Sequence, residues 1–321
     1  MMGNILLNKK ILFIAPLFYG YEDKIATEIN NRGGKVLFFP ERQYNWGYRI
    51  FNNFSKTFLN IYQKQYYNSI LKKTENEKKI DILFVVRGCQ MPREFPDLLK
   101  KRYPGIKTIM YQWDSEKSNQ YIHLRDLFDE IYTFDFDDAR TFHLRYLPLF
   151  YTKDIETAAS RSTIDQYDYF FLSSYNWERY EYLRKLLIQL SNVRFYHYLH
   201  IPFSTYIKER LKGYRIDKDL LKFEPMSRKQ YIQKLMEARV IIDISPSIQS
   251  GLPMRIIEAL GARRKIVTTN ANISKEFGDS RTMRLISDNF DFQNYANEKC
   301  DIYPDEIKKY SLDEWISTIF A

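Results

Sequence analysis

The chain has 321 residues, which is enough for two compact domains with substantial cores. Its composition, 45% hydrophobic and 28% charged, is ordinary for a globular protein, and no stretch approaches the length of a transmembrane span. Lys and Arg outnumber Asp and Glu by 49 to 40, so the net charge is +9, which fits a phosphate-bearing ligand, a nucleic acid or an anionic membrane surface.

Two further features concern the compartment. The first 15 residues lack the plan of a signal peptide, because Lys9 and Lys10 are followed directly by a strand-like run. Cys89 and Cys300 match no metal-ligand or disulfide spacing, which agrees with a reducing environment. We therefore expect a cytoplasmic protein.

The first part of the sequence has the pattern of a Rossmann-like domain. Lys10–Pro16 is an apolar run that ends in a loop, Leu17–Gly20, and a helical pattern follows over Tyr21–Arg32. The loop lacks the G-x-G-x-x-G fingerprint, which disfavours a dinucleotide cofactor. Further strands are predicted at Val36–Phe39, Asp81–Arg87, Lys107–Trp113 and Glu130–Phe134.

A long helical pattern covers Tyr44–Lys79. Aromatic residues recur there at spacings of three and four, at Tyr48, Phe51, Phe54, Phe58, Tyr62 and Tyr66. We expect this stripe to face the core. The alternative is a peripheral membrane contact, since the same segment carries Lys56, Lys64, Lys72 and Lys73.

A domain boundary is predicted near residue 151. Thr152–Gln166 is polar and lacks periodicity, and a new strand begins at Tyr167. We expect residues 1–151 to form the first domain and 152–305 the second, with a terminal helix in 306–321 that returns to the first domain.

The most informative stretch is Ile241–Asn270. It predicts a buried strand at Val240–Ile244, a polar loop over Ser245–Gly251, a helix over Met254–Leu260 and a second strand at Lys265–Thr269. Such a unit brings the loop and the helix N-terminus to the carboxyl end of a parallel strand, where open α/β sheets bind ligands and phosphate.

Arg255 and Glu258 are the charged pair in that helix. They lie one turn apart, so both side chains can share the face that looks towards the loop. The carboxylate can accept two ribose hydroxyls, while Arg255 and the loop amides face a diphosphate. The alternative is a solvated ion pair on a helix surface.

This stretch resembles the donor-nucleotide segment of bacterial glycosyltransferases of the GT-B type, in particular those of capsule, exopolysaccharide and lipopolysaccharide gene clusters. The shared pattern is Q-x-G-L-x-M-R-x-x-E-A-L-G followed by K-x-(I/V)-T-T-N, from Gln249 to Asn270. The resemblance implies an α/β fold with two Rossmann-like domains facing each other across a cleft. It also implies transfer of a sugar from a nucleotide-sugar donor to a saccharide or lipid-linked acceptor in surface polysaccharide assembly.

The resemblance also implies a donor site. An Arg after a short loop at a strand end binds the diphosphate in place of a metal, and Arg179 occupies that position. We therefore expect no metal and no cofactor, and we interpret the D-x-D at Asp135–Asp137 as a helix start. Many retaining GT-B enzymes have an acid where this chain has Ser250, so the motif does not support a retaining mechanism. The expected donor-binding residues are Arg179, Ser245, Gln249, Ser250, Gly251, Arg255 and Glu258.

The acceptor is expected at the strand ends of the first domain. Tyr19 and Asp23 are candidate acceptor contacts, and Glu22 is a candidate catalytic residue beside them, the second choice for the base; the alternative is that these acids stabilise the helix start. Asp114 follows Tyr-x-Trp, where the resembling family has an acid. It is either the general base for the acceptor hydroxyl or a helix cap.

Two other functions are compatible with parts of the sequence. A nucleotide-sugar-binding protein without transferase activity would keep Arg255 and Glu258 and lack a base. A nucleic-acid-binding protein would explain the +9 charge and leave the motif stretch unexplained, so we expect no nucleic-acid partner.

Overall fold

The computed structural model describes residues 5–48, 51, 55–161, 164–246, 248–299 and 302–321. The chain divides into two compact units. The N-terminal unit comprises Met1–Leu149, Ile248–Gly251 and Leu312–Ala321, and the C-terminal unit comprises Phe150–Ser247 and Leu252–Ser311. The first division therefore falls two residues before the boundary that the sequence predicts, and the returning segment begins at Leu312.

The N-terminal unit is built on a parallel six-stranded sheet in the order β2-β1-β3-β4-β5-β6. The first five strands along the chain coincide with the predicted apolar runs, whereas β6 was not predicted, and β1 and β3 are buried because helices cover both faces of a parallel sheet. The strands are β1 (Lys10–Ala15), β2 (Lys35–Pro40), β3 (Ile82–Val86), β4 (Lys107–Gln112), β5 (Glu130–Thr133) and β6 (Arg145–Tyr146).

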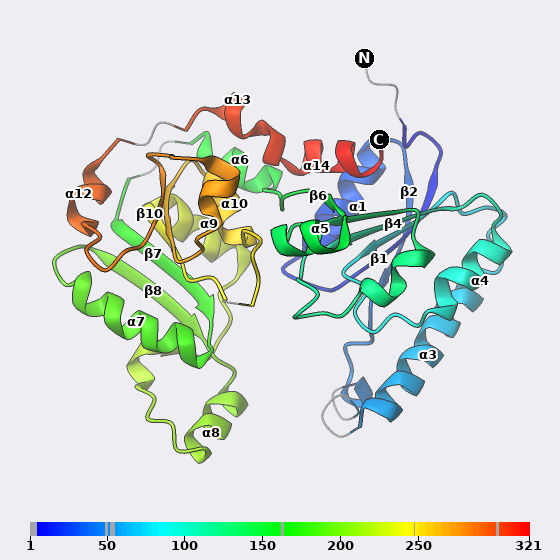
Figure 1. Cartoon of the computed structure of the whole chain (residues 1–321), viewed down its shortest axis with the longest axis horizontal. Helices are drawn as coiled ribbons and strands as arrows, with labels where there is room; N and C mark the ends of the chain where they lie inside the picture. Colours follow the sequence, from blue (N-terminus) through cyan, green and yellow to red (C-terminus); the bar gives the residue numbers. More distant parts are fainter. Residues whose placement is uncertain (1–4, 49–50, 52–54, 162–163, 247, 300–301) are drawn as a thin grey trace. The chain divides into compact units, whose positions relative to one another are not determined.

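Helices alternate with these strands, as in a Rossmann-like domain (Figure 1). They are α1 (Tyr21–Asn31), α3 (Lys56–Lys73), α4 (Glu94–Arg102), the 3₁₀ helix η1 (Ile122–Leu127), α5 (Phe136–Phe142) and the C-terminal α14 (Leu312–Ile319). Helix α14 packs beside α1, where Arg32 Nη1 donates to Ser317 Oγ at 2.8 Å. Its Trp315 is buried against Tyr111 of β4, with ring centroids 4.7 Å apart.

The C-terminal unit repeats the plan with a second parallel six-stranded sheet, in the order β12-β11-β10-β7-β8-β9 (Figure 1). Its strands are β7 (Tyr167–Ser174), β8 (Phe195–His200), β9 (Leu221–Lys222), β10 (Ala238–Asp243), β11 (Lys265–Thr268) and β12 (Met283–Leu285). Its helices are α6 (Lys153–Ala159), α7 (Trp177–Gln189), α8 (Phe203–Leu211), η2 (Lys218–Leu220), α9 (Arg228–Glu237), α10 (Met254–Gly261), α11 (Ile273–Phe277), α12 (Phe292–Asn297), α13 (Pro304–Ile307) and η3 (Lys308–Tyr310).

Two predicted helix starts are confirmed by their caps. Ser227 caps α9 in a capping box with Gln230, which satisfies two backbone donors that the first turn would leave unpaired. Asp135 caps α5 and accepts from the amides of Asp137 and Asp138. The D-x-D sequence is therefore a helix start, as expected.

Helix α6 was not predicted, and one prediction about local structure is wrong. This helix lies within Thr152–Gln166, where the lack of periodicity predicted no element. The helical pattern over Tyr44–Lys79 does not form one helix. Residues 46–48 and 51 are helical, Ser55 is not, and α3 begins after this Ser55 cap and ends at Lys73, so the aromatic positions do not lie on one helix.

As a result only part of the aromatic stripe reaches the core. Tyr48 and Tyr66 are buried, Phe51 and Tyr62 are half-buried, and Phe58 is exposed. Phe54 lies outside the described residues. None of the helices within the described part of the chain is long and apolar enough to cross a membrane. Cys89 is a free thiol. Cys300, like Phe54, lies outside the described residues.

Candidate functional site

Each sheet has a point where the order of strands reverses. In the C-terminal sheet the chain runs outward from β7 through β8 to β9 and then returns with β10 on the other side of β7. The crevice outside the carboxyl ends of such a strand pair is the usual ligand site of an open α/β sheet. The candidate site of this unit therefore lies where β7 ends at Ser174 and β10 ends at Asp243.

Arg179 spans these two strand ends. It lies in the first turn of α7, where its amide donates to the capping side chain of Asn176 at 2.7 Å. Its guanidinium donates from Nε to the carbonyl of Ile244 at 3.2 Å and from Nη1 to the carbonyl of Ser174 at 3.3 Å. No carboxylate within the described residues forms an ion pair with Arg179.

Burial lowers the pKa of Arg179 to about 10, and the positive charge of Arg255 contributes to the shift. Arg179 nevertheless stays protonated at neutral pH. A half-buried cation whose described partners are carbonyls, beside a second cation, is an environment that an anion would stabilise.

Arg255 and Ser245 both contact Asp243, the last residue of β10. This buried carboxylate lies 2.6 Å from Nη1 of Arg255 and accepts from the Ser245 hydroxyl at 2.6 Å and the Thr268 hydroxyl at 2.8 Å. Arg255 stands in the first turn of α10, whose N-terminus has no side-chain cap. Backbone donors at an uncapped helix start favour an anion in the same place as the two guanidinium groups.

Glu258 lies one turn further along α10 and is 3% exposed. Its Oε1 is 2.5 Å from Nη1 of Arg228, the first residue of α9. Arg228 also contacts the carboxylate of Asp154 at 3.2 Å and donates to the Thr152 hydroxyl at 2.9 Å. The solvated surface pair is therefore wrong for Glu258, because its side chain is buried and Arg228 fixes its orientation.

The other three predicted donor residues are grouped with the N-terminal unit. Gln249 is half-buried there. Ser250 donates from its amide to Asp135 Oδ2 at 2.7 Å and from its hydroxyl to Oδ1 at 2.6 Å, and the Gly251 amide donates to Oδ2 at 3.1 Å. These two amides are thus hydrogen-bonded to a carboxylate, and their contact with a diphosphate stays a prediction. Ser247 of the same loop lies outside the described residues.

Sequence reasoning missed two residues of this site. Asp243 was included in an apolar run as a strand residue, although an acid at the end of a buried strand signals a polar partner. The sequence around Arg228 predicts only that a helix starts there. It does not indicate that the side chain is directed at Glu258.

In the N-terminal sheet the order of strands reverses between β1 and β3. The loop after β1 exposes Phe18 and Tyr19, and Tyr19 has a left-handed backbone with φ of 52°. The carboxylate of Glu22 is turned into this loop and accepts from the Phe18 amide at 3.1 Å, whereas Asp23 is exposed in the first turn of α1. Glu22 therefore stabilises the loop, and Tyr19 and Asp23 remain accessible.

The loop after β3 is the most strained part of this edge. Arg87 and Gln90 have φ of 68° and 58°, values that cost residues other than glycine free energy and that cluster at functional sites. Arg87 forms an ion pair with the fully buried Glu41, and its Nη1 lies 3.3 Å from Oδ2 of Asp114.

Asp114 is partly exposed after β4 and is followed by a turn, not by a helix. The next helical segment, η1, is capped by Glu116, whose carboxylate accepts hydrogen bonds from the amides of Tyr121 and Ile122. The structure therefore does not support a capping role for Asp114 and leaves its carboxylate at the strand edge beside Arg87.

A polar pocket of about 840 Å³ opens on this edge, between the start of α3 and the loops after β3 and β4. Lys56 and Lys117 line it together with the amides of Asn60, Gln90 and Asn119. Asn119 also donates to the carbonyl of Arg87 at 3.4 Å, so this pocket adjoins the segment that holds Asp114. Amides and cations of this kind suit a hydroxyl-rich ligand.

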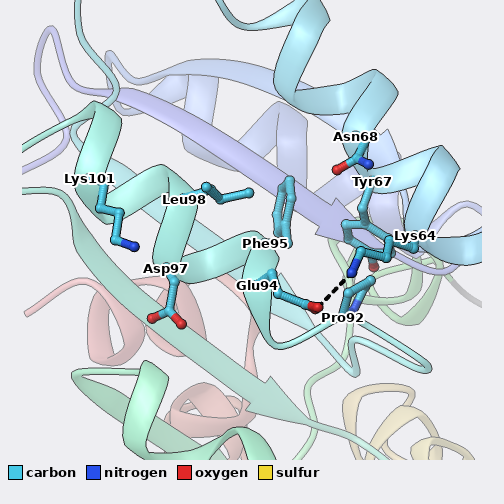
Figure 2. Close-up of a pocket in the computed structure, with 9 residues that line it drawn as sticks. All are labelled: Lys64, Tyr67, Asn68, Pro92, Glu94, Phe95, Asp97, Leu98 and Lys101. Atoms are coloured by element: carbon cyan, nitrogen blue, oxygen red, sulfur yellow. Dashed lines mark hydrogen bonds and ion pairs between the residues drawn. The ribbon is translucent and has the colours of Figure 1, made fainter.

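A smaller pocket of about 400 Å³ lies between α3 and α4 (Figure 2). Its wall includes the ion pair of Lys64 with Glu94, which are 2.7 Å apart, and the exposed Leu98. It belongs to the helical layer and not to the strand ends, so we do not include it in the candidate site. Among the described residues, no group of three or more His, Cys, Asp or Glu side chains could hold a metal ion.

The sequence matches no protein-family model and no sequence in the set of curated proteins with which it was compared. Its fold is similar to that of several solved structures. The UDP-N-acetylglucosamine 2-epimerase of Rickettsia bellii has a TM-score of 0.59 at 15% identity and covers 97% of this chain and 96% of its own. The trehalose-phosphate synthase of Burkholderia xenovorans has a TM-score of 0.58 at 11% identity, with coverages of 96% and 98%.

The lipopolysaccharide outer core galactosyltransferase WaaB has a TM-score of 0.54 at 12% identity, with coverages of 97% and 99%. Likeness at this level of identity concerns the fold. It confirms the predicted α/β class with two Rossmann-like domains, as in GT-B proteins. One fold hosts different activities, as the epimerase among these structures illustrates, so the activity must be argued from the site.

Proposed function

We propose that the protein is a glycosyltransferase that moves a sugar from a nucleotide-sugar donor to a hydroxyl of a saccharide or lipid-linked saccharide, in the cytoplasm and in surface polysaccharide assembly. The observation that carries the proposal is the convergence of Arg179, Arg255 and the uncapped start of α10 on the β7/β10 strand ends. Three positive features at one strand edge favour a diphosphate.

The remaining donor contacts follow from this position. Glu258 lies one turn beyond Arg255 and binds the ribose, and Arg228 acts as a positioning residue that fixes its carboxylate. Ser245 stands beside Asp243 at the strand end and contributes a hydroxyl. Gln249, Ser250 and Gly251 complete the donor contacts as the motif implies.

In the reaction, the bond between the anomeric carbon and the terminal phosphate oxygen breaks, and its electron pair goes to that oxygen. The acceptor oxygen bonds to the anomeric carbon, and its proton goes to Asp114. Because negative charge grows on the leaving diphosphate, Arg179 and Arg255 stabilise the transition state more than the ground state. The two cations supply this stabilisation without a metal ion.

The acceptor side consists of Asp114 and the pocket with Lys56 and Lys117, together with Tyr19 and Asp23 of the neighbouring loop. Exposed aromatic rings at Phe18 and Tyr19 offer flat apolar surfaces for a sugar ring. Glu22 supports the loop from within and is the second candidate base if Asp114 proves dispensable.

The test is an assay with a panel of nucleotide sugars, in which release of nucleoside diphosphate is measured with and without saccharide and lipid extracts as acceptors. A transferase releases diphosphate from one donor and does so faster with an acceptor. Donor binding without any release would support the non-catalytic binding protein instead. Salt-sensitive binding to oligonucleotides without donor binding would support the nucleic-acid-binding protein.

A further inference from the structure

Helix α8 of the C-terminal unit carries an apolar stripe that faces away from the domain. None of its residues is buried, and Phe203, Ile207 and Leu211 are 58%, 41% and 83% exposed. These residues are four apart, so they share one face of the helix. A stripe with this spacing normally packs against a core.

The opposite side of α8 holds the helix on its domain. Tyr206 packs its ring against Phe223 at 5.5 Å between centroids, and Thr205 and Glu209 are half-buried on that side. Phe203 reaches the same Phe223 ring from the end of the helix. The orientation of α8 is thus fixed by contacts of its own, and these leave the apolar stripe exposed.

Basic residues border the stripe on both sides. At about 100° per residue, Arg210 lies beside Phe203, and Lys208 and Lys212 lie beyond Leu211. Residues 203–215 contain four basic side chains and one acid, a net charge of +3 (4 − 1), and that acid, Glu209, is paired with Lys212. Lys208, Arg210 and Arg215 form no ion pair with any described residue.

The patch continues to the candidate donor site. Tyr214 follows α8 and contacts the ring of Trp177 at 4.5 Å, and both rings are 37% exposed. Trp177 begins α7, two residues before Arg179. In Figure 1, α8 projects from the unit beyond the end of β8, which is the edge of the sheet where β7 and β10 also end.

We propose that this α8 patch, made of Phe203, Ile207, Leu211, Tyr214 and Trp177, binds the surface of an anionic lipid bilayer. An apolar stripe with aromatic residues and flanking Lys and Arg is the pattern of a helix that lies in the membrane interface. A second copy of the chain suits it less, because a two-fold contact would place the net positive charge around the patch of one copy beside the same positive charge of the other.

The inference does not depend on the proposed function, because lipid binding needs no donor. It adds to that function a preference for acceptors that reside at a membrane. Docking through the α8 patch brings the strand ends that carry Arg179 close to the lipid surface, where a lipid-linked saccharide resides.

The test is cosedimentation of the full chain with vesicles of phosphatidylcholine, with and without phosphatidylglycerol. We expect binding to the anionic vesicles only, and a loss of binding as salt shortens the range of the attraction to about 8 Å or less. Ile207→Glu with Leu211→Glu should lower the partition coefficient at least about tenfold. Arg210→Gln should lower it about fivefold, the effect of one basic residue at a charged surface.

Matched variants identify the surface. Ile188→Glu changes an isolated exposed residue of α7 and should bind vesicles as the wild type does. Phe58→Glu with Ile61→Glu tests the alternative membrane contact on α3, where both side chains are exposed. The proposal is overturned if the wild type ignores anionic vesicles, if the α3 variant alone loses binding, or if the α8 variant binds normally. It is also overturned if gel filtration shows that the wild type is a dimer, the α8 variant is a monomer, and both bind vesicles equally.

Discussion

The guanidinium of Arg255 lies 2.6 Å from the buried carboxylate of Asp243, so part of its charge is offset before any ligand arrives. Arg179, at the same strand ends, donates instead to two backbone carbonyls. The two arginines that we expect at the diphosphate therefore differ in their partners in this structure. An incoming diphosphate gains most from Arg179, while Arg255 and Asp243 fix the position of the helix start.

Glu258 provides the first prediction. Glu258→Gln keeps the shape of the side chain and removes its charge, so we expect nucleoside diphosphate binding to weaken by about 1–3 kcal/mol as the ribose loses a charged acceptor. Calorimetry measures the change. The control is Asp154→Asn, which removes the other carboxylate of Arg228 and should leave affinity near the wild-type value. Equal affinity in Glu258→Gln and the wild type would remove Glu258 from the donor site.

Most of the fold could be predicted from the sequence because its strands are apolar runs bounded by loops. The β10, α10 and β11 segments match their predicted ranges to within about two residues. The stripe on α8 and the aromatic residues around Phe58 show the limit. Periodicity tells which side chains share a face, and only the packing of neighbouring elements decides whether that face is buried.

The candidate site could be predicted less completely than the fold. The motif residues Arg255 and Glu258 were found, but their ion-pair partners Asp243 and Arg228 were not, because partners that are distant in sequence depend on strand order and helix orientation. Asp114 was found by its position after a strand. Its pairing with Arg87 depends on the left-handed backbone of Arg87 itself, which the sequence does not predict, since Arg rarely adopts that conformation.

A second prediction concerns the packing of α10 in the C-terminal unit. A Cβ added at Gly261 would lie 2.4 Å from Cγ of Tyr151, so Gly261→Ala forces a backbone shift. We expect a loss of about 1–3 kcal/mol in the free energy of unfolding, measured by urea denaturation. Gly47→Ala is the comparison, because its Cβ would meet the Tyr62 hydroxyl at 3.0 Å and should cost much less. Similar midpoints for both variants would contradict the close approach of α10 to Tyr151.

A third prediction concerns the base. Asp114→Asn keeps a polar group beside Arg87 and cannot take a proton, so turnover should fall by at least about 10²-fold while donor affinity changes little. Asp126→Asn is a matched control, since Asp126 is an exposed acid of the same unit paired with Arg93. If Asp114→Asn turns over as fast as the control, Asp114 is not the base and Glu22→Gln becomes the next variant to assay.

A fourth prediction concerns metal. If Arg179 and Arg255 neutralise the leaving diphosphate, transfer should continue at an undiminished rate in excess chelator. The measurement is the rate of diphosphate release before and after dialysis against chelator. Loss of activity that returns with magnesium or manganese would contradict the metal-free donor site.

The central claim is that Arg179 binds the donor diphosphate, and calorimetric titration of Arg179→Met with nucleoside diphosphates tests it most directly. Arg184→Met is the control, because Arg184 is an exposed residue of the same helix. A charge-assisted contact contributes about 1.5–3 kcal/mol, so Arg179→Met should bind about 10- to 150-fold more weakly than the control. Because burial lowers the pKa of Arg179 below its unfolded value, the charge costs stability at neutral pH, and the variant should melt no lower than the wild type. Wild-type affinity in a folded Arg179→Met protein would contradict the account.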